Sequence, residues 1–321
     1  MRRLARLGLV PVIALISACS SEPAPAPAGA PPAVEATEYK SRYDQWRAER
    51  QAVITHAVQT IGLWPIQEGD TAFGTDDKLP IVLPKKAGPA KVGVFRRRGN
   101  TITVVPEAGA PLTLENGTPV TDPLEMKTVM NPTPTVLAIG SVRLQIEQVF
   151  ESSGSRRWVS AWDEDHPIVK SPPKVEAYPT DQRWRLAARF DAFDSPRPTR
   201  LPDVRGGFMD LTAVGQLVFS VNGAEQRLTA FAFEGSDTLL VMFKDPTNLT
   251  TTYQGYRVLY PDGVEHGEVT ILDFNLAANP PCAYSRFTTC PLAPPENRMK
   301  VAVEAGEKRY PSADGYIPKT E

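Results

Sequence analysis

The densest run of side chains able to bind or react extends from Asp273 to Tyr284. It reads Asp-Phe-Asn-Leu-Ala-Ala-Asn-Pro-Pro-Cys-Ala-Tyr and combines a carboxylate, two amides, a thiol and a phenol. Prolines recur here and shortly after, at Pro280, Pro281, Pro291, Pro294 and Pro295. Proline fixes φ and lowers the entropy of the unfolded chain, so we expect a rigid, irregular Pro/Cys-rich loop that follows a buried strand.

Two interpretations of the polar residues in and around this loop remain open. The favoured one is that they satisfy the backbone of an irregular loop, which needs such partners in any case. The alternative is a pocket for a small polar ligand. Its candidate binding residues are Tyr253, Arg257, Asn275, Asn279 and Asn297, and the weak catalytic candidates for a hydrolase-like enzyme are Lys244, Asp245, Asp273 and Cys282.

Cys282 and Cys290 are the only thiols besides Cys19. In an oxidising compartment the default expectation is a disulfide between them, and closing this short ring stabilises by roughly 2.5 kcal/mol. The alternative is that one is a nucleophile, which requires a nearby base or cation. No histidine stands near either cysteine in the sequence, and two cysteines without histidine partners make a poor zinc site.

The first nineteen residues have the pattern of a bacterial lipoprotein signal. Three arginines, Arg2, Arg3 and Arg6, precede an apolar run from Leu7 to Ile16, and Ile16-Ser17-Ala18 stands before Cys19. The run is too short to span a bilayer, and small residues directly before a cysteine favour lipid modification. We therefore expect a lipid anchor at Cys19 that makes the membrane a partner. Ser20 in the next position points to the periplasmic face of the outer membrane in the bacterial cell envelope.

Residues 20–36 alternate proline with alanine and contain almost nothing able to form a core, so they indicate a tether of roughly 50 Å. In residues 37–62, apolar side chains recur at spacings of three and four, which predicts an amphipathic helix that ends at Gly62. The apolar positions are Tyr39, Tyr43, Trp46, Val53, Ile54, Ala57 and Ile61. His56 lies beside them without an evident partner.

Beyond Gly62 the pattern changes to short runs of Val, Thr and aromatic residues separated by turn residues, which predicts a mainly β fold. We expect two lobes shaped as β-sandwiches or barrels, at residues 63–166 and 180–321, joined by a proline-rich connection. Predicted strands of the first lobe are Lys91–Arg97, Thr101–Val105, Thr135–Ile139, Val142–Phe150 and Arg157–Trp162. Predicted strands of the second are Trp184–Phe190, Gly215–Val221, Gln226–Glu234, Leu239–Lys244, Tyr256–Tyr260 and Glu268–Phe274. Asn222-Gly223 predicts a tight hairpin turn.

Composition and motifs exclude several classes of protein. The net charge of −2 argues against a nucleic-acid partner. The sequence lacks a phosphate-binding glycine loop, a Gly-x-Ser-x-Gly elbow, a His-Glu-x-x-His pair and a calcium loop, so no cofactor is predicted. Asp163 to His166 is an adjacent polar run typical of an exposed turn, and no metal site is predicted.

The C-terminal motifs resemble the family called domain of unknown function 1684 (DUF1684). The likeness covers most of the chain after Tyr39 and is strongest from about Trp184 onward. It rests on Arg200–Gly206, Phe243-Lys244-Asp245, Thr252-Tyr253, Gly255-Tyr256-Arg257, Asp273–Tyr284, Thr288–Pro291, Pro294–Arg298 and Ala305–Lys308. Near Tyr253 many relatives look richer in glycine. The family has no established activity or ligand, so the resemblance implies none.

Two classes of function therefore remain. The favoured one is a membrane-anchored, non-enzymatic periplasmic lipoprotein that binds an envelope protein or a small polar ligand. The alternative is an enzyme whose site is assembled from Lys244 and Asp245, Arg257, and the segment from Asp273 to Cys282.

Overall fold

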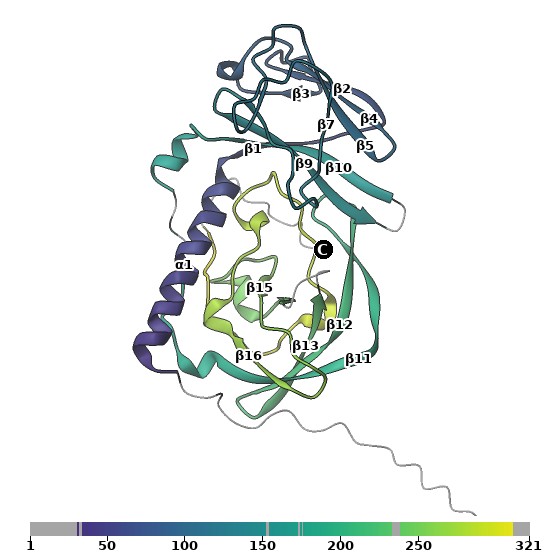
Figure 1. The fold of residues 1–321 in the computed structure, drawn as a ribbon. Helices are drawn as coiled ribbons and strands as arrows, with labels where there is room; N and C mark the ends of the chain where they lie inside the picture. The colour runs from purple at the N-terminus through teal and green to yellow at the C-terminus, as the bar shows by residue number, and fades with distance from the viewer. Residues whose placement is uncertain are drawn as a thin grey trace, which may run out of the picture.

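The computed structural model describes residues 31, 34–151, 154–172, 174, 176–232 and 238–310, in a mainly β fold. Within these ranges a single α-helix, α1, precedes sixteen strands in three sheets. Figure 1 shows two sheets at one end of the molecule, a third, strongly curved sheet at the other, and α1 along one side. Cys19, the signal and most of the tether lie outside the described residues.

Helix α1 spans Ala36–Gln59 and begins at a side-chain cap. The Glu35 carboxylate accepts hydrogen bonds from the backbone N–H groups of Thr37 (2.8 Å) and Glu38 (3.2 Å). The predicted end at Gly62 was wrong. Thr60 is already extended (φ −67°, ψ 122°) and opens a strand that pairs with Trp162. Gly62 lies within that strand, where an added Cβ would be 1.9 Å from the Trp64 ring.

The first lobe is a sandwich of two five-stranded sheets. One has the order β1-β10-β9-β8-β6 and the other β3-β2-β4-β5-β7. Their bounds are β1 Thr60–Pro65, β2 Gly69–Gly74, β3 Ile81–Val82, β4 Gly93–Arg98, β5 Thr101–Pro106, β6 Thr113–Leu114, β7 Leu124–Glu125, β8 Leu137–Ile139, β9 Val142–Glu151 and β10 Gly154–Asp163. Apolar side chains from both sheets fill the space between them, with the Phe73 and Phe95 rings stacked at 4.6 Å. The five strands predicted here are present as β4, β5, β8, β9 and β10.

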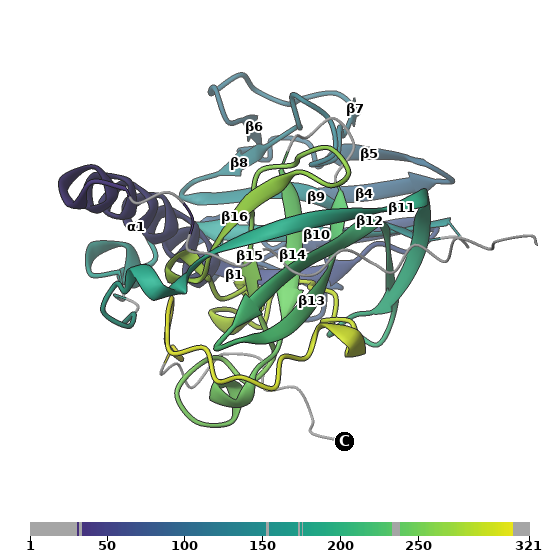
Figure 2. The same ribbon diagram turned by 90° about the horizontal axis from the view of Figure 1, so that it is seen from below.

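The second lobe is built on one six-stranded sheet of order β15-β14-β13-β12-β11-β16. Its bounds are β11 Arg185–Pro202, β12 Phe208–Val221, β13 Ala224–Ala232, β14 Leu239–Phe243, β15 Arg257–Leu259 and β16 Val269–Asp273. Strands β11 and β12 run far across the molecule, as Figure 2 shows. The tight turn between β12 and β13 is confirmed, since Asn222 and Gly223 both have positive φ (51° and 79°).

Strand β14 is buried on both faces, which explains its uninterrupted apolar sequence. Leu239, Val241 and Phe243 belong to one apolar cluster. Leu240 and Met242 belong to another, together with Ile54 and Ala57 of α1. The curved sheet is thus covered on one face by the helix and the Cys282–Cys290 loop, and on the other by the segment around Met299–Ala305.

The region after β16 is irregular, as predicted, with three-residue 3-10 turns at Phe274–Leu276, Pro281–Ala283 and Pro295–Asn297. It returns to the first lobe, where Phe287 and Thr288 approach α1 and β10. No helix in the described ranges is both long and apolar enough to cross a membrane.

Candidate functional site

Asp245 and Arg257 form an ion pair whose side chains have no exposed surface. Arg257 Nη2 donates to Asp245 Oδ1 (2.9 Å) and to the Val303 carbonyl (3.0 Å), and Nη1 donates to the Ala305 carbonyl. Asp245 Oδ2 in turn accepts from the Val303 N–H (2.7 Å). Desolvation lowers the pKa of Arg257 and the Asp245 charge opposes that shift. The ion pair therefore connects β15 and Asp245, which lies just after β14, to the C-terminal segment around Val303 and Ala305.

The side chain of Asn297 hydrogen-bonds to the backbone of two neighbouring strands, β13 and β14. Its side-chain amide donates to the carbonyls of Thr229 (2.9 Å) and Met242 (2.8 Å) and accepts from the Thr229 N–H (2.7 Å). The neighbouring Lys244 is only partly buried. Its pKa is lowered, first by desolvation and then by the charge of Arg298. The side chain of Asn297 and the backbone of Lys244 therefore link β13 and β14 to the turn at residues 295–299.

Asp273 and Asn275 form hydrogen bonds with the first turn of α1 and with the segment that precedes β11. Tyr39 donates its hydroxyl to Asp273 Oδ2 (3.0 Å), and Asn275 Nδ2 donates to Asp273 Oδ1 (2.9 Å). Asn275 also exchanges two hydrogen bonds with the backbone of Asp181, both 2.9 Å long. Burial raises the pKa of Asp273 above its usual range, while these hydrogen bonds and Arg185 oppose the rise.

Asn279 belongs to a network centred on Glu307, a residue that the sequence reasoning did not single out. Glu307 has no exposed surface and accepts from the Asn279 N–H (2.6 Å), the Tyr284 hydroxyl (2.7 Å) and Arg50 Nε (3.1 Å). The Asn279 amide donates to the carbonyl of Lys308 (2.9 Å). In the sequence, Glu307 is marked by its position in the motif Ala305–Lys308, where it follows two small residues.

Cys282 and Cys290 are free thiols in the structure, 1% and 3% exposed. They interact directly. The hydrogen bond between their side chains raises the pKa of Cys282, with desolvation adding to the rise, and lowers that of Cys290. Tyr253 Oη lies 3.9 Å from Cys282 Sγ. The disulfide therefore stays a prediction, and burial leaves Cys282 without the exposure that a nucleophile needs.

The nine predicted binding and catalytic residues thus form small groups: Asp245 with Arg257, Asp273 with Asn275, Tyr253 with Cys282, and Lys244 with Asn297, while Asn279 joins Glu307. Each makes contacts that fix the irregular C-terminal segment. None of the nine lines either of the two cavities described next.

The larger cavity lies between the lobes and has a volume of about 610 Å³. This is within the range of small-molecule sites. Its floor is the outer face of the first-lobe sheet that contains β9 and β10. The residues of this floor are Trp158, Ser160 and Trp162 of β10 and Glu147 of β9. The other walls come from the last turns of α1, from Met209 of β12, and from Pro281 and the residues Phe287–Thr289.

The floor residues face the cavity because of strand periodicity. Val159 and Ala161 point into the sandwich core, so Trp158, Ser160 and Trp162 point the opposite way. Two of the five tryptophans of the chain therefore stand on one outer face of a strand. That alternation, Trp-x-Ser-x-Trp, was the signal in the sequence. An outward tryptophan pair on a sandwich requires a cover or a ligand.

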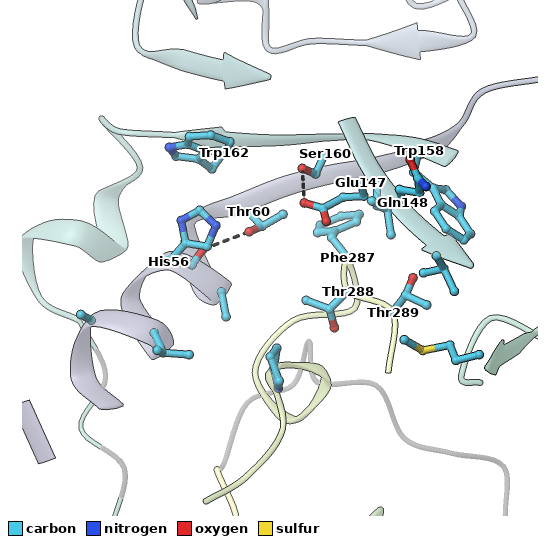
Figure 3. A pocket seen from close by; sticks show the side chains of 17 residues that line it. His56, Thr60, Glu147, Gln148, Trp158, Ser160, Trp162, Phe287, Thr288 and Thr289 are labelled. Carbon is cyan, nitrogen blue, oxygen red and sulfur yellow. Dashed lines mark hydrogen bonds between the residues drawn. The ribbon is translucent and has the colours of Figure 1, made fainter. Parts of the chain in front are cut away.

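Polar groups converge on this apolar space (Figure 3). Ser160 Oγ donates to Glu147 Oε1 (2.9 Å), and Gln145 Nε2 donates to the same oxygen (2.8 Å). Thr289 Oγ1 is buried without a hydrogen-bond partner among the described residues. His56 also lines the cavity, and the centroid of its ring lies 5.2 Å from that of the Trp162 ring. Desolvation lowers the pKa of His56, and the Glu147 charge opposes that shift.

The Ser160 hydroxyl donates its hydrogen bond to the Glu147 carboxylate. The His56 ring packs against the ring of Trp162. Within the described ranges, no cluster of three or more His, Cys, Asp or Glu side chains could hold a metal ion.

A smaller cavity of about 310 Å³ lies on the other side of Phe287. Its walls include His166, Tyr284, Ser285, Arg286 and Tyr310. Thr60 and Phe287 line both cavities. The two cavities therefore adjoin each other at these two residues.

Comparisons with known proteins locate the similarity in the second lobe. The family described as "Protein of unknown function (DUF1684)" matches residues 173–308. No curated protein matches the chain. Among solved structures, the solution NMR structure of an uncharacterized protein from Haloarcula marismortui is 30% identical, over 44% of this chain and 80% of that one, with a TM-score of 0.38. Through its second lobe and C-terminal segment, the chain belongs to the DUF1684 family of proteins of unknown function.

Proposed function

We propose that this protein is a lipid-anchored periplasmic lipoprotein that binds a small ligand in the cavity between its lobes. The signal before Cys19 and the Pro/Ala-rich tether support the anchored location, most consistently at the outer membrane. A tethered binding domain can sample the periplasm while its lipid holds it at the membrane. The ligand has an apolar body and a hydrogen-bonding group, which refines the expectation of a small polar ligand.

The observation that carries this proposal is the cavity floor. Trp158 and Trp162 present aromatic surface next to a carboxylate that two neutral donors hold in place. Apolar pockets with a few convergent polar groups are the usual form of small-molecule sites. The deeper polar residues of the family motif are occupied in tying the C-terminal segment together, which disfavours the hydrolase-like alternative.

Native mass spectrometry of the full-length protein, extracted from membranes in detergent, tests binding directly. We expect a small molecule to accompany the intact protein and to be absent from Thr288→Trp, because a bulky side chain on the wall fills the cavity. Thr121→Trp, at an exposed position of the first lobe, is the matched control and keeps the ligand. Equal spectra for wild type and Thr288→Trp, both without ligand, would contradict the proposal.

The anchored location has a separate test. Cys19→Ser removes the only residue that can carry the lipid, so the protein should move from the membrane fraction to the soluble fraction of the periplasm. Cys290→Ser leaves the signal intact and is the control. Persistent membrane association of Cys19→Ser would overturn the anchoring.

A further inference from the structure

We propose that the ligand of the cavity between the lobes is an organic cation, a protonated amine attached to an aromatic or other apolar body. This inference rests on the proposed binding function and names the class of molecule bound. The ammonium group contacts the free oxygen of Glu147, and the apolar body lies against Trp158, Trp162 and Phe287.

The charge of the cavity walls favours a cation. Among the described residues, Glu147 is the one acidic residue that lines the cavity, and neither lysine nor arginine lines it. His56 is the other titratable side chain among the described lining residues, and desolvation lowers its pKa, which favours its neutral form. The described walls therefore offer a single acidic group in largely apolar surroundings.

Glu147 is held by hydrogen bonds in a way that also suits a cation. Both hydrogen bonds from Ser160 and Gln145 go to Oε1 and come from neutral donors. Oε2 accepts no hydrogen bond, and Glu147 forms no ion pair, within the described part of the chain. A partly buried carboxylate is costly without a positively charged partner. A carboxylate that is oriented but not neutralised is suited to an incoming cation, because charge-assisted hydrogen bonds are about twice as strong as neutral ones.

The aromatic side chains around Glu147 also favour a cation. The faces of tryptophan rings attract cations, and the attraction grows where water is excluded. The Trp158 ring already shows this behaviour, since the guanidinium carbon of Arg156 lies 4.8 Å from its centroid. Arg156 itself is paired with Asp203 and is not among the cavity-lining residues. The Glu147 charge beside these rings therefore still lacks a partner.

Other ligand classes fit less well. An anion would be repelled by Glu147 and would find no lysine or arginine among the described wall residues. A wholly apolar ligand would remove water from the carboxylate without replacing its hydrogen bonds. A divalent cation would need several oxygen ligands, whereas the wall residues that the structure describes supply one carboxylate.

Three probes of matched size test the proposal: phenethylamine, the neutral phenethyl alcohol, and the anionic hydrocinnamate. Their binding to the full-length protein in detergent is followed by quenching of tryptophan fluorescence and by isothermal titration calorimetry at pH 7. We expect phenethylamine to bind at least about tenfold more tightly than the alcohol, and hydrocinnamate to bind more weakly than both.

Glu147→Gln keeps the shape of the side chain and removes its charge. In this variant the amine should lose its advantage over the alcohol, while the alcohol binds as to wild type. Glu125→Gln, at an exposed position on β7, is the control and should bind all three probes as wild type does. Glu147→Asp keeps the charge and should still prefer the amine, so the proposal remains testable if Glu147→Gln fails to fold.

The outcomes separate this inference from the proposed function. If alcohol and amine bind equally to wild type, or if Glu147→Gln keeps the amine preference, the cation proposal fails while the binding function stands. If no probe binds and no ligand accompanies the purified protein, both fail.

Discussion

At the scale of single residues, the polar side chains of the C-terminal motif act mainly as partners for backbone and for each other. Asn297, Asn275 and Asp245 each hydrogen-bond to main-chain groups of segments that are distant in sequence. Buried main-chain groups are expensive to leave unsatisfied, so these side chains contribute to the stability of the fold. The residues of the cavity are different ones, and they come from the first lobe, α1, Met209 and the segment Pro281–Thr289.

Glu307 offers the clearest test of this structural role. Glu307→Gln leaves the Arg50 guanidinium, whose side chain is 13% exposed, without its charged partner. Breaking a buried pair in this way costs about 3 kcal/mol. Urea unfolding followed by circular dichroism should show that loss. The exposed Glu304→Gln, three residues earlier, should change the free energy of unfolding by less than about 0.5 kcal/mol. Equal stability of both variants would contradict the role given to Glu307.

Asp273 gives a pH dependence with a definite sign. Burial raises its pKa above 3.8 in the folded protein, so the folded state binds the proton more tightly than the unfolded state. The stability that Asp273 contributes is therefore present below pH 3.8 and is lost as the pH rises through its folded pKa. We expect the free energy of unfolding of wild type, minus that of Asp273→Asn, to fall as the pH is raised from 3.8. A difference that grows over this range would show that the sign is wrong.

At the scale of elements, the segment Ala305–Lys308 of the family motif packs closely against the residues that follow β16. Gly306 has a positive φ of 75°, and an added Cβ would lie 2.5 Å from the carbonyl oxygen of Ala277. Glycine is therefore required there both by conformation and by space. This close approach is what brings Glu307 to Arg50 and Asn279.

Gly306→Ala isolates the effect of that close contact. Gly109 has nearly the same φ, 72°, but nothing lies within 4 Å of its added Cβ. Gly109→Ala should thus show only the conformational cost, about 1 kcal/mol, whereas Gly306→Ala should lose about 2 kcal/mol more. Thermal unfolding of the two variants measures the difference. Equal losses would mean that the backbone near Ala277 yields freely.

The Cys282–Cys290 loop forms one wall of the cavity, and its redox state can be read directly. We expect the periplasmic protein, unfolded in guanidinium chloride without a reductant, to resist alkylation at both cysteines until it is reduced. Unfolding is needed because both thiols are buried. Immediate alkylation, detected by mass spectrometry, would show that the free thiols of the structure persist in the cell envelope.

At the scale of the whole molecule, α1 and the C-terminal segment join two lobes that have separate apolar cores. Ile54 and Ala57 of α1 pack into the second lobe, while the last turn of the helix leads directly into β1 of the first. Arg156 of β10 bonds across to Asp203 and to the carbonyl of Phe208. Residues of α1, β1, β9, β10, β12 and the segment Pro281–Thr289 line the cavity.

The Arg156 contact predicts that the lobes unfold together. Arg156→Gln removes the charged partner of Asp203, whose side chain has no exposed surface, and should lower the free energy of unfolding by about 2 kcal/mol. Hydrogen exchange should show the loss in β10 and β12 alike. Arg98→Gln, at a side chain 61% exposed, is the control and should have little effect. A loss confined to one lobe would contradict the coupling.

The sequence by itself determined the features that depend on neighbours along the chain. Alternating apolar residues specified the strands from β8 to β10, and Asn222-Gly223 specified its turn, because strand period and turn geometry are local properties. The motifs of the C-terminal half, the run from Asp273 to Tyr284 among them, were together sufficient to recognise the family. The end of α1 was misplaced, because pairing of Thr60 with Trp162, about a hundred residues away, decides it.

Only the tertiary structure decided which side chains share a space. Arg50 and Glu307 are 257 positions apart, and no periodicity connects them. The same holds for the cavity, whose floor is the outward face of a sandwich and whose walls come from a helix and a distant loop. Local pattern shows which way Trp158 and Trp162 point from their strand. What lies opposite them depends on how the chain folds back, because burial results from contacts between segments that are remote in sequence.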